Sequence, residues 1–297
     1  MRRGASLALL GALGLLGGCH RHPPAKDVQA AAQPPLWMIS DATGPRAWLF
    51  GTVHALPEGV KWQGPAIVKA VGAADRLVLE VGDELNPQNA QSALARLGFT
   101  PGLPPPSERI APERKADLLA LYKKLGVDDR NFVGEESWAV ALQLAAIASK
   151  QEGVTADNGV EPALREMAKG KPVEGLETLD VQFGAFDGLS ERDQAALLAD
   201  VAHEASRGDT EDRDMMLLWV KGDTQGIAAE ARKGFLAEPG LRAALLTKRS
   251  NKWAQEIDAM IQRGAHPFVA VGAAHVSGAD GLPALMAARG YTVRRIQ

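Results

Sequence analysis

The chain has 297 residues, of which 33 are basic and 36 acidic, so its formal net charge is −3. This near-neutral balance, without a basic stripe, argues against a nucleic-acid partner. Cys19 is the single cysteine, which excludes a disulfide framework within the chain. The length suffices for one domain with a sizeable core, or for one domain carrying an insertion.

The first 18 residues have the pattern of a secretory leader. Arg2 and Arg3 are followed by a short apolar stretch and then by Leu-Gly-Gly-Cys, which ends at Cys19. The apolar stretch is too short for a spanning helix. Because Leu-Gly-Gly-Cys resembles a bacterial lipobox, we expect residues 1–18 to be a lipoprotein signal peptide. Cys19 would then be the lipidated amino terminus, carrying acyl chains such as palmitate.

Residues 19–35 are rich in proline, alanine and glutamine, and predict a flexible tether between the lipid and the domain. No aspartate follows Cys19. By resemblance to sorted lipoproteins, this favours the outer membrane, with the domain facing the periplasm. We expect contact with the membrane through this anchor only, because no later apolar run is long enough to span a bilayer.

The first part of residues 36–297 predicts a hairpin followed by a β-α-β unit. Two β-like runs, 36–40 and 46–50, are joined by Asp-Ala-Thr-Gly. A helix over 63–74 and a strand over 76–81 then favour parallel pairing. Further helices are predicted over 86–97, 112–125, 135–150 and 159–169, and a short strand over 171–175.

The remainder predicts a long helical segment and a return to the sheet. Residues from about 178 to 264 are mainly helical in pattern and suggest an insertion. A strand over 266–272, a helix over 282–289 and a strand over 291–296 follow. The predicted fold is therefore α/β: a central mixed, largely parallel sheet built from two strand–Gly-x-x-His–helix–strand halves, with a long helical insertion.

Two matching tetrapeptides end apolar runs at opposite ends of the chain. Gly51-Thr-Val-His54 follows Ala-Trp-Leu-Phe, and Gly272-Ala-Ala-His275 follows Phe-Val-Ala-Val. Ligands gather at the carboxyl ends of strands in open α/β sheets. Alone, each histidine would more often be structural. Together they favour one composite site containing His54 and His275.

Three further residues are candidates for the same site. Glu80 interrupts an apolar strand, where a buried carboxylate is costly unless it is paired or bound to a metal. Its alternative is an edge-strand residue facing solvent. Glu177 follows the next strand, or else it is a helix-start acid favoured by the macrodipole. Arg249 begins a helix with apolar residues at core spacing, and lies in the site or on its rim. Glu161 is better explained as a solvated or capping acid.

These residues are compatible with two kinds of chemistry. Two histidines and a carboxylate suit a divalent transition metal such as Mn, Co or Zn, which activates water or polarises a carbonyl. The same residues without metal suit a histidine base oriented by a glutamate. The sequence has no His-Glu-x-x-His, Gly-x-Ser-x-Gly or phosphate-binding loop.

In these residues the chain resembles the TraB/GumN family. This family is related to the Tiki metalloproteases and more distantly to the erythromycin esterases. The resemblance covers most of the mature chain. It rests on Trp48-Leu-Phe-Gly-Thr-Val-His54, the strand with Glu80, Gly175-Leu-Glu-Thr178, the stretch from Arg249 to Trp253, and Val271-Gly-Ala-Ala-His-Val-Ser-Gly278.

The resemblance implies an α/β fold with helical insertions and an active site formed by His54, Glu80 and His275, with Glu177 and Arg249 in support. Tiki-like members are divalent-metal-dependent proteases, whereas the esterase-like relatives use histidine and glutamate without a metal. Two departures from the family pattern occur. Ser250 replaces an asparagine, and Glu161 replaces an aspartate.

We therefore predict a hydrolase of the bacterial cell envelope, of the metal-dependent peptidase or amidase kind. Its metal ligands would be His54, Glu80 and His275, with Arg249 as an oxyanion or carboxylate contact. Its substrate would be a peptide or another small molecule of the envelope. The alternatives are a metal-independent His/Glu hydrolase, a lipoprotein that binds metal, haem or peptide without turnover, and a structural envelope protein.

Overall fold

The structure is a computed structural model, and it describes residues 32–53, 56, 60–82, 86–151, 159–207 and 211–297. The predicted leader, Cys19 and His54 lie outside these residues. Within the described ranges, no helix combines the length and the apolar character that a bilayer crossing needs.

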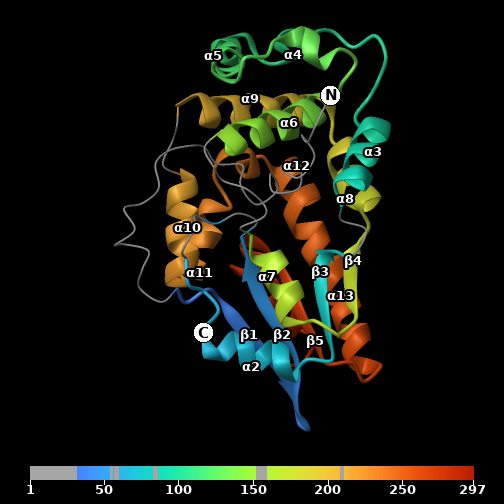
Figure 1. Ribbon diagram of the computed structural model, residues 1–297, viewed down its shortest axis with the longest axis vertical. Helices are drawn as coiled ribbons and strands as arrows, with labels where there is room; N and C mark the ends of the chain where they lie inside the picture. The colour runs from blue at the N-terminus through green and yellow to red at the C-terminus, as the bar shows by residue number, and fades with distance from the viewer. Residues whose placement is uncertain (1–31, 54–55, 57–59, 83–85, 152–158, 208–210) are drawn as a thin grey trace.

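A six-stranded mixed sheet forms the lower part of the molecule (Figure 1). Its order is β4-β3-β5-β2-β1-β6. β1 is antiparallel to both of its neighbours, whereas β2, β5, β3 and β4 pair in parallel. The predicted mixed, largely parallel sheet is confirmed. The strands are β1 (Leu36–Asp41), β2 (Gly44–Thr52), β3 (Arg76–Val81), β4 (Val173–Glu177), β5 (Pro267–Gly272) and β6 (Thr292–Arg295).

β2 and β5, the strands that lead into the two Gly-x-x-His segments, are neighbours in the sheet. Their register pairs Gly51 with Val271 and Thr52 with Gly272. The helices that follow them pack on opposite faces of the sheet, however: α2 (Pro65–Ala73) on one and α14 (Leu282–Ala287) on the other. The two strand–helix–strand units therefore differ in their path, and a repeated half is not confirmed.

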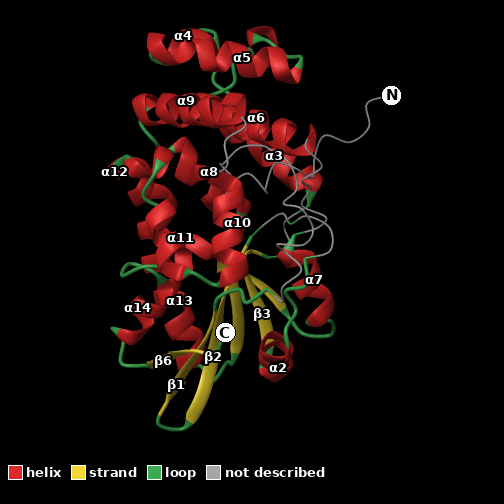
Figure 2. Ribbon diagram, turned by 90° about the vertical axis from the view of Figure 1, so that its left-hand side faces the viewer, coloured by secondary structure: helices red, strands yellow, loops and turns green. Residues whose placement is uncertain are grey.

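Alternation along the strands gives the sheet two apolar faces. Leu77, Leu79, Phe50 and Phe268 join one core cluster with α2 and α7 (Val160–Met167). The alternate residues of the same strands face α13 (Lys248–Gln262) and α14 in a second cluster: Leu49, Val78, Val269 and Val271. Figure 2 shows the sheet edge-on between these helices.

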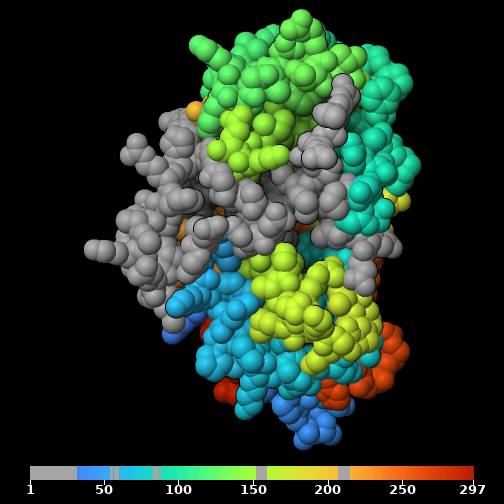
Figure 3. All heavy atoms as spheres, in the orientation of Figure 1, coloured from blue at the N-terminus to red at the C-terminus, as the bar shows by residue number. Residues whose placement is uncertain are grey.

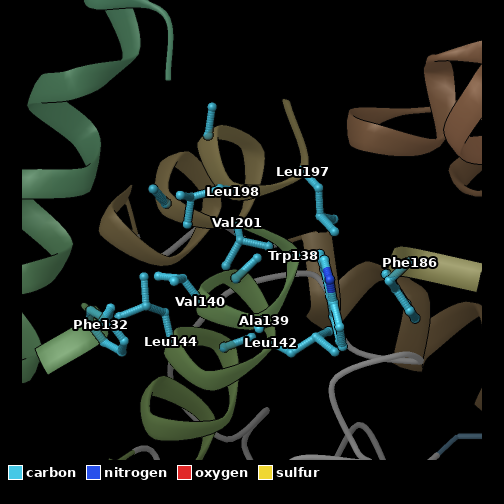
Figure 4. Close-up of a cluster of buried hydrophobic side chains, with 14 of the residues drawn as sticks. Phe132, Trp138, Ala139, Val140, Leu142, Leu144, Phe186, Leu197, Leu198 and Val201 are labelled. Atoms are coloured by element: carbon cyan, nitrogen blue, oxygen red, sulfur yellow. The ribbon is translucent and has the colours of Figure 1, made fainter. Parts of the chain in front are cut away.

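The upper part of the molecule is helical and has its own core. Trp138 lies at its centre, with ring centroids 5.7 Å from Phe183 and 5.9 Å from Phe186 (Figure 4). Its helices come from two stretches of the chain, and Figure 3 shows α4–α6 in green above α2 and α7. They are α3 (Pro87–Leu97), α4 (Pro106–Arg109), α5 (Lys115–Leu125), α6 (Ser137–Gln151), α8 (Leu179–Asp187), α9 (Glu191–Arg207) and α12 (Pro239–Arg242). Between them in the chain, α10 (Glu211–Lys221) and α11 (Thr224–Glu230) place Trp219, Val220 and Ile227 in the core cluster of the sheet that also contains Phe50.

Two of the connections between this helical part and the sheet lie entirely within the described residues. Thr178 caps α8 directly after β4 ends, by accepting from the Val181 N–H. On the other side, a π-helical turn (Ala243–Thr247) leads from α12 into α13. Such π turns occur frequently at functional sites, and this one ends two residues before Arg249.

Candidate active site

The sheet delivers acidic and imidazole side chains to one edge. Glu80 is the penultimate residue of β3, Glu177 is the last of β4, and His275 lies in the 3₁₀ turn that follows β5 (Ala273–Val276). Because β4, β3 and β5 are adjacent and parallel, their carboxyl ends meet at the same edge. The prediction that these three side chains share one end of the sheet is consistent with this topology.

Glu80 and Glu177 are both held by Arg249. Its Nη2 lies 2.9 Å from Glu80 Oε2 and also contacts Glu177 Oε1, while its Nε lies 3.2 Å from Glu177 Oε2. Its Nη1 donates to the Leu245 carbonyl oxygen in the π turn at 3.0 Å. Every guanidinium nitrogen of Arg249 therefore binds a protein group, so Arg249 contacts carboxylates of its own chain.

This ion-pair cluster is buried. Glu80, Glu177 and Arg249 are 8%, 7% and 8% exposed, which rules out the solvent-facing alternative for Glu80. Burial raises the pKa of Glu177, although the charge and hydrogen bonds of Arg249 oppose this. Burial alone would lower the pKa of Arg249, but the two glutamates raise it overall. The guanidinium thus stays charged and compensates two buried acids.

The glycine of the second Gly-x-x-His segment, Gly272, lies against Glu80 and leaves little room for a larger residue. Its N–H donates to Glu80 Oε1 at 2.8 Å. A Cβ on Gly272 would lie 3.2 Å from that oxygen and 3.8 Å from His275 Cδ2. The absence of a side chain therefore lets the Glu80 carboxylate and the His275 imidazole approach the same point.

His275 is fixed by α13. Its Nδ1 lies 2.8 Å from Ser250 Oγ, and its ring centroid lies 4.4 Å from that of Trp253. The Arg249 Cζ lies 4.6 Å from the Trp253 ring. One face of α13 therefore orients both the imidazole and the guanidinium. Ser250, which departs from the family pattern, supplies the hydrogen bond.

The end of β2, which leads to His54, is held by α7 and α10. The buried Thr52 donates from Oγ1 to Glu161 Oε1 at 2.8 Å, and the Val160 N–H donates to the Val53 carbonyl at 3.3 Å. The Trp219 indole donates to the Gly51 carbonyl at 2.8 Å. The sequence suggests a solvated or capping acid at Glu161, and this residue does lie half-buried in the first turn of α7. The sequence did not show its bond to Thr52, two residues before His54, which forms because α7 packs against the sheet.

The described residues do not by themselves fit a metal. Among them, no three His, Cys, Asp or Glu side chains are arranged to hold an ion. Glu80 already binds Arg249 and the Gly272 N–H, and a guanidinium in contact with the carboxylate repels a cation. Since His54 lies outside the described residues, a metal bound by His54, Glu80 and His275 stays a prediction.

Sequence reasoning missed one buried polar residue of this site, Gln182. It comes from α8 and donates from Nε2 to Glu80 Oε2 at 3.4 Å. Its signal was present in the sequence, because Leu179, Gln182, Phe183 and Phe186 form one buried helical stripe in which only Gln182 is polar.

Fold and site together define an α/β protein in which adjacent parallel strands bring buried carboxylates, a guanidinium and an imidazole to one edge of the sheet. The profile of the TraB/PrgY/gumN family matches residues 35–295, and the chain belongs to this family.

Two relatives are similar over most of their length. Both are described as "Uncharacterized protein YbaP", one from Shigella flexneri and one from Escherichia coli strain K12. Each is 25% identical over 255 residues, which cover 84% of this chain and 92% of the relative. No solved structure shows a significant match to the chain.

Proposed function

We propose that the chain is a hydrolase of amide or ester bonds, of the peptidase or amidase kind. The observation that carries this proposal is the buried Glu80–Arg249–Glu177 cluster beside His275. Apolar residues of similar volume would often stabilise a fold as well as a buried ion pair, or better. Such a cluster at the ligand-binding edge of a sheet therefore favours a functional role.

In this proposal the reaction uses Glu80 and His275 for proton transfer. Water attacks the carbonyl carbon as Glu80 accepts its proton, so that a C–O bond forms and the carbonyl π electrons move to oxygen. The oxyanion electrons then re-form the carbonyl as the C–N or C–O bond breaks, and His275 gives a proton to the leaving group. Proton exchange with solvent returns Glu80 and His275 to their starting forms. Imidazole suits this step because it exchanges protons near neutral pH. Arg249 and Glu177 keep the Glu80 carboxylate in place.

The resemblance also implies a divalent metal such as Mn, Co or Zn, and elemental analysis tests this separately. The soluble domain, from Pro34 onward, would be purified without chelator beside a His54→Ala/His275→Ala double variant. Near-stoichiometric metal that the double variant loses would support a metal-dependent hydrolase. Absence of metal after loading would favour the His/Glu form of the proposal.

A peptide, amide and ester substrate screen tests the hydrolase itself. Glu80→Gln and His275→Ala should each lower turnover by about 100-fold or more, because each removes a proton-transfer group. His203→Ala is the matched control, since His203 bonds to Asp117 between α9 and α5 in the helical part. Full turnover in both site variants would refute the proposal. Binding of peptide or haem without any turnover would favour a binding lipoprotein.

The location in the envelope is part of the proposal and rests on the predicted leader and Cys19. Cys19→Ala should abolish labelling by palmitate and release the protein from the outer-membrane fraction, as expected when acyl chains are the only anchor. Unchanged membrane association of the Cys19→Ala variant would contradict a lipid anchor.

A further inference from the structure

Gln182 occupies an unusual position for a glutamine. It is 5% exposed and lies one turn into α8, in a stripe otherwise formed by Leu179, Phe183 and Phe186. Phe183 and Phe186 pack on Trp138, so the helix cannot rotate Gln182 towards solvent without breaking the core of the helical part. The fold therefore keeps an amide beside the Glu80 carboxylate.

Only one end of this amide is bonded. Its Nε2 donates to Glu80 Oε2, whereas its Oε1 is buried and has no hydrogen-bond partner among the described residues. The neighbouring carboxylate decides this orientation, because the flipped amide would place two acceptor oxygens against each other. A buried polar atom without a partner is destabilising, and such atoms in native proteins often mark a functional site or an ordered water.

We propose that Gln182 binds the reacting water, with Oε1 as the acceptor of one of its O–H groups. This inference rests on the hydrolase function proposed above. The other O–H of the water donates to Glu80, whose Oε2 already accepts from the Gln182 Nε2. With both hydrogens engaged, a lone pair of the water is directed away from the two side chains, towards the substrate carbonyl.

With Gln182 bound to the water, the proton transfers of the proposed hydrolysis stay the same. The proton that faces Glu80 moves to that carboxylate as the new C–O bond forms, and the proton that faces Gln182 stays on the oxygen. Gln182 thus orients the nucleophile and exchanges no proton. Because it contacts water and not the organic substrate, its loss should change kcat and leave KM nearly constant.

Gln194 of α9 provides a matched control. It is also a buried glutamine, 7% exposed, and its Nε2 also donates to a glutamate, Glu136 Oε2, at 3.1 Å. It belongs to the helical part and has a further contact with the Leu189 carbonyl. A change at Gln194 therefore tests the loss of a buried glutamine without touching the site.

The experiment has a crystallographic and a kinetic arm. A high-resolution crystal structure of the wild-type protein should contain a water within hydrogen-bonding distance of both Gln182 Oε1 and a Glu80 oxygen. Gln182→Met should lack this water and lower kcat about 10- to 100-fold at constant KM, as expected when a reactant loses its orientation. Gln194→Met should leave kcat unchanged. Gln182→Asn, which draws the amide back by one methylene, provides the same test if the methionine variant does not fold.

The outcomes separate this inference from the hydrolase proposal. A wild-type structure in which a protein donor fills Gln182 Oε1 and no water is present would overturn the inference, whatever the activity. An unchanged kcat in a folded Gln182 variant would also overturn it. If no substrate is hydrolysed but the water is in place, the hydrolase proposal fails and the water site stands as a binding feature.

Discussion

Arg249 and Glu80 are 169 positions apart in the sequence, yet the Arg249 Nη2 lies 2.9 Å from Glu80 Oε2 inside the protein. α13 brings the arginine and β3 the glutamate, and Glu177 from β4 binds the same guanidinium. This contact ties the second half of the chain to the first. It therefore connects the stability of the fold to the integrity of the candidate site.

Arg249→Met should lower the free energy of unfolding by about 3–5 kcal/mol, because it leaves two buried carboxylates without their counter-charge. Urea denaturation followed by circular dichroism measures this. Arg46→Met is the control, since its ion pair with Asp41 is exposed to solvent and should contribute far less. Equal effects of the two changes would show that burial of the Arg249 cluster is unimportant.

Gly272→Ala should disturb the site through the methyl group that it adds. The new Cβ would lie 3.2 Å from Glu80 Oε1, and overpacking of this kind costs about 1–3 kcal/mol. The turnover of the proposed hydrolysis should decrease as well, because the added methyl group displaces Glu80 and His275. Gly72→Ala in α2 is the control, because nothing lies within 4 Å of its added Cβ. That change should be neutral or stabilise the protein by up to about 1 kcal/mol. If Gly272→Ala keeps the stability and the turnover of the wild type, Gly272 is not closely packed against Glu80 and this prediction is wrong.

Ser250→Ala should lower stability by about 1–3 kcal/mol, because it removes the hydroxyl that bonds to the His275 Nδ1 in the interior. Ser250→Asn restores the residue type of the family pattern, and should recover activity if its amide reaches the same nitrogen. Thermal unfolding and turnover are measured for both variants. Ser206→Ala is the matched control, because its hydroxyl donates to the His203 carbonyl of its own helix, away from the candidate site. If Ser250→Ala behaves like Ser206→Ala, the hydroxyl does not fix the imidazole.

Glu135→Gln should change how stability depends on pH. Burial raises the pKa of Glu135 above its usual 4.5, although a hydrogen bond from Gln143 and the charge of Arg109 oppose this. The folded state then binds this proton more tightly than the unfolded state. The stabilising contribution is complete below pH 4.5 and is lost as the pH rises through the folded-state pKa. The variant should therefore gain stability relative to the wild type as the pH rises above 4.5 in a urea titration series. A constant difference across that range would contradict the shift.

Local patterns in the sequence predicted much of the sheet. Alternating and continuous apolar runs located β1, β2, β3 and β5. The pattern of apolar side chains along a strand is visible within a few consecutive residues. They also identified Glu80 as a carboxylate in an apolar strand, and its burial confirms this. The two Gly-x-x-His segments suggested one composite site. The strands that lead into them, β2 and β5, are paired, and because His54 lies outside the described residues the composite site stays a prediction.

Other features depended on contacts between distant segments. The sequence determined which residues form strands and helices, and which polar residues interrupt them. Only the tertiary structure decided that Arg249 binds two glutamates, that Glu161 bonds to Thr52, and that Gln182 lies against Glu80. The physical reason is that helix and strand patterns arise from near neighbours. A hydrogen bond between side chains some 100 positions apart requires the packed core that aligns the elements carrying them.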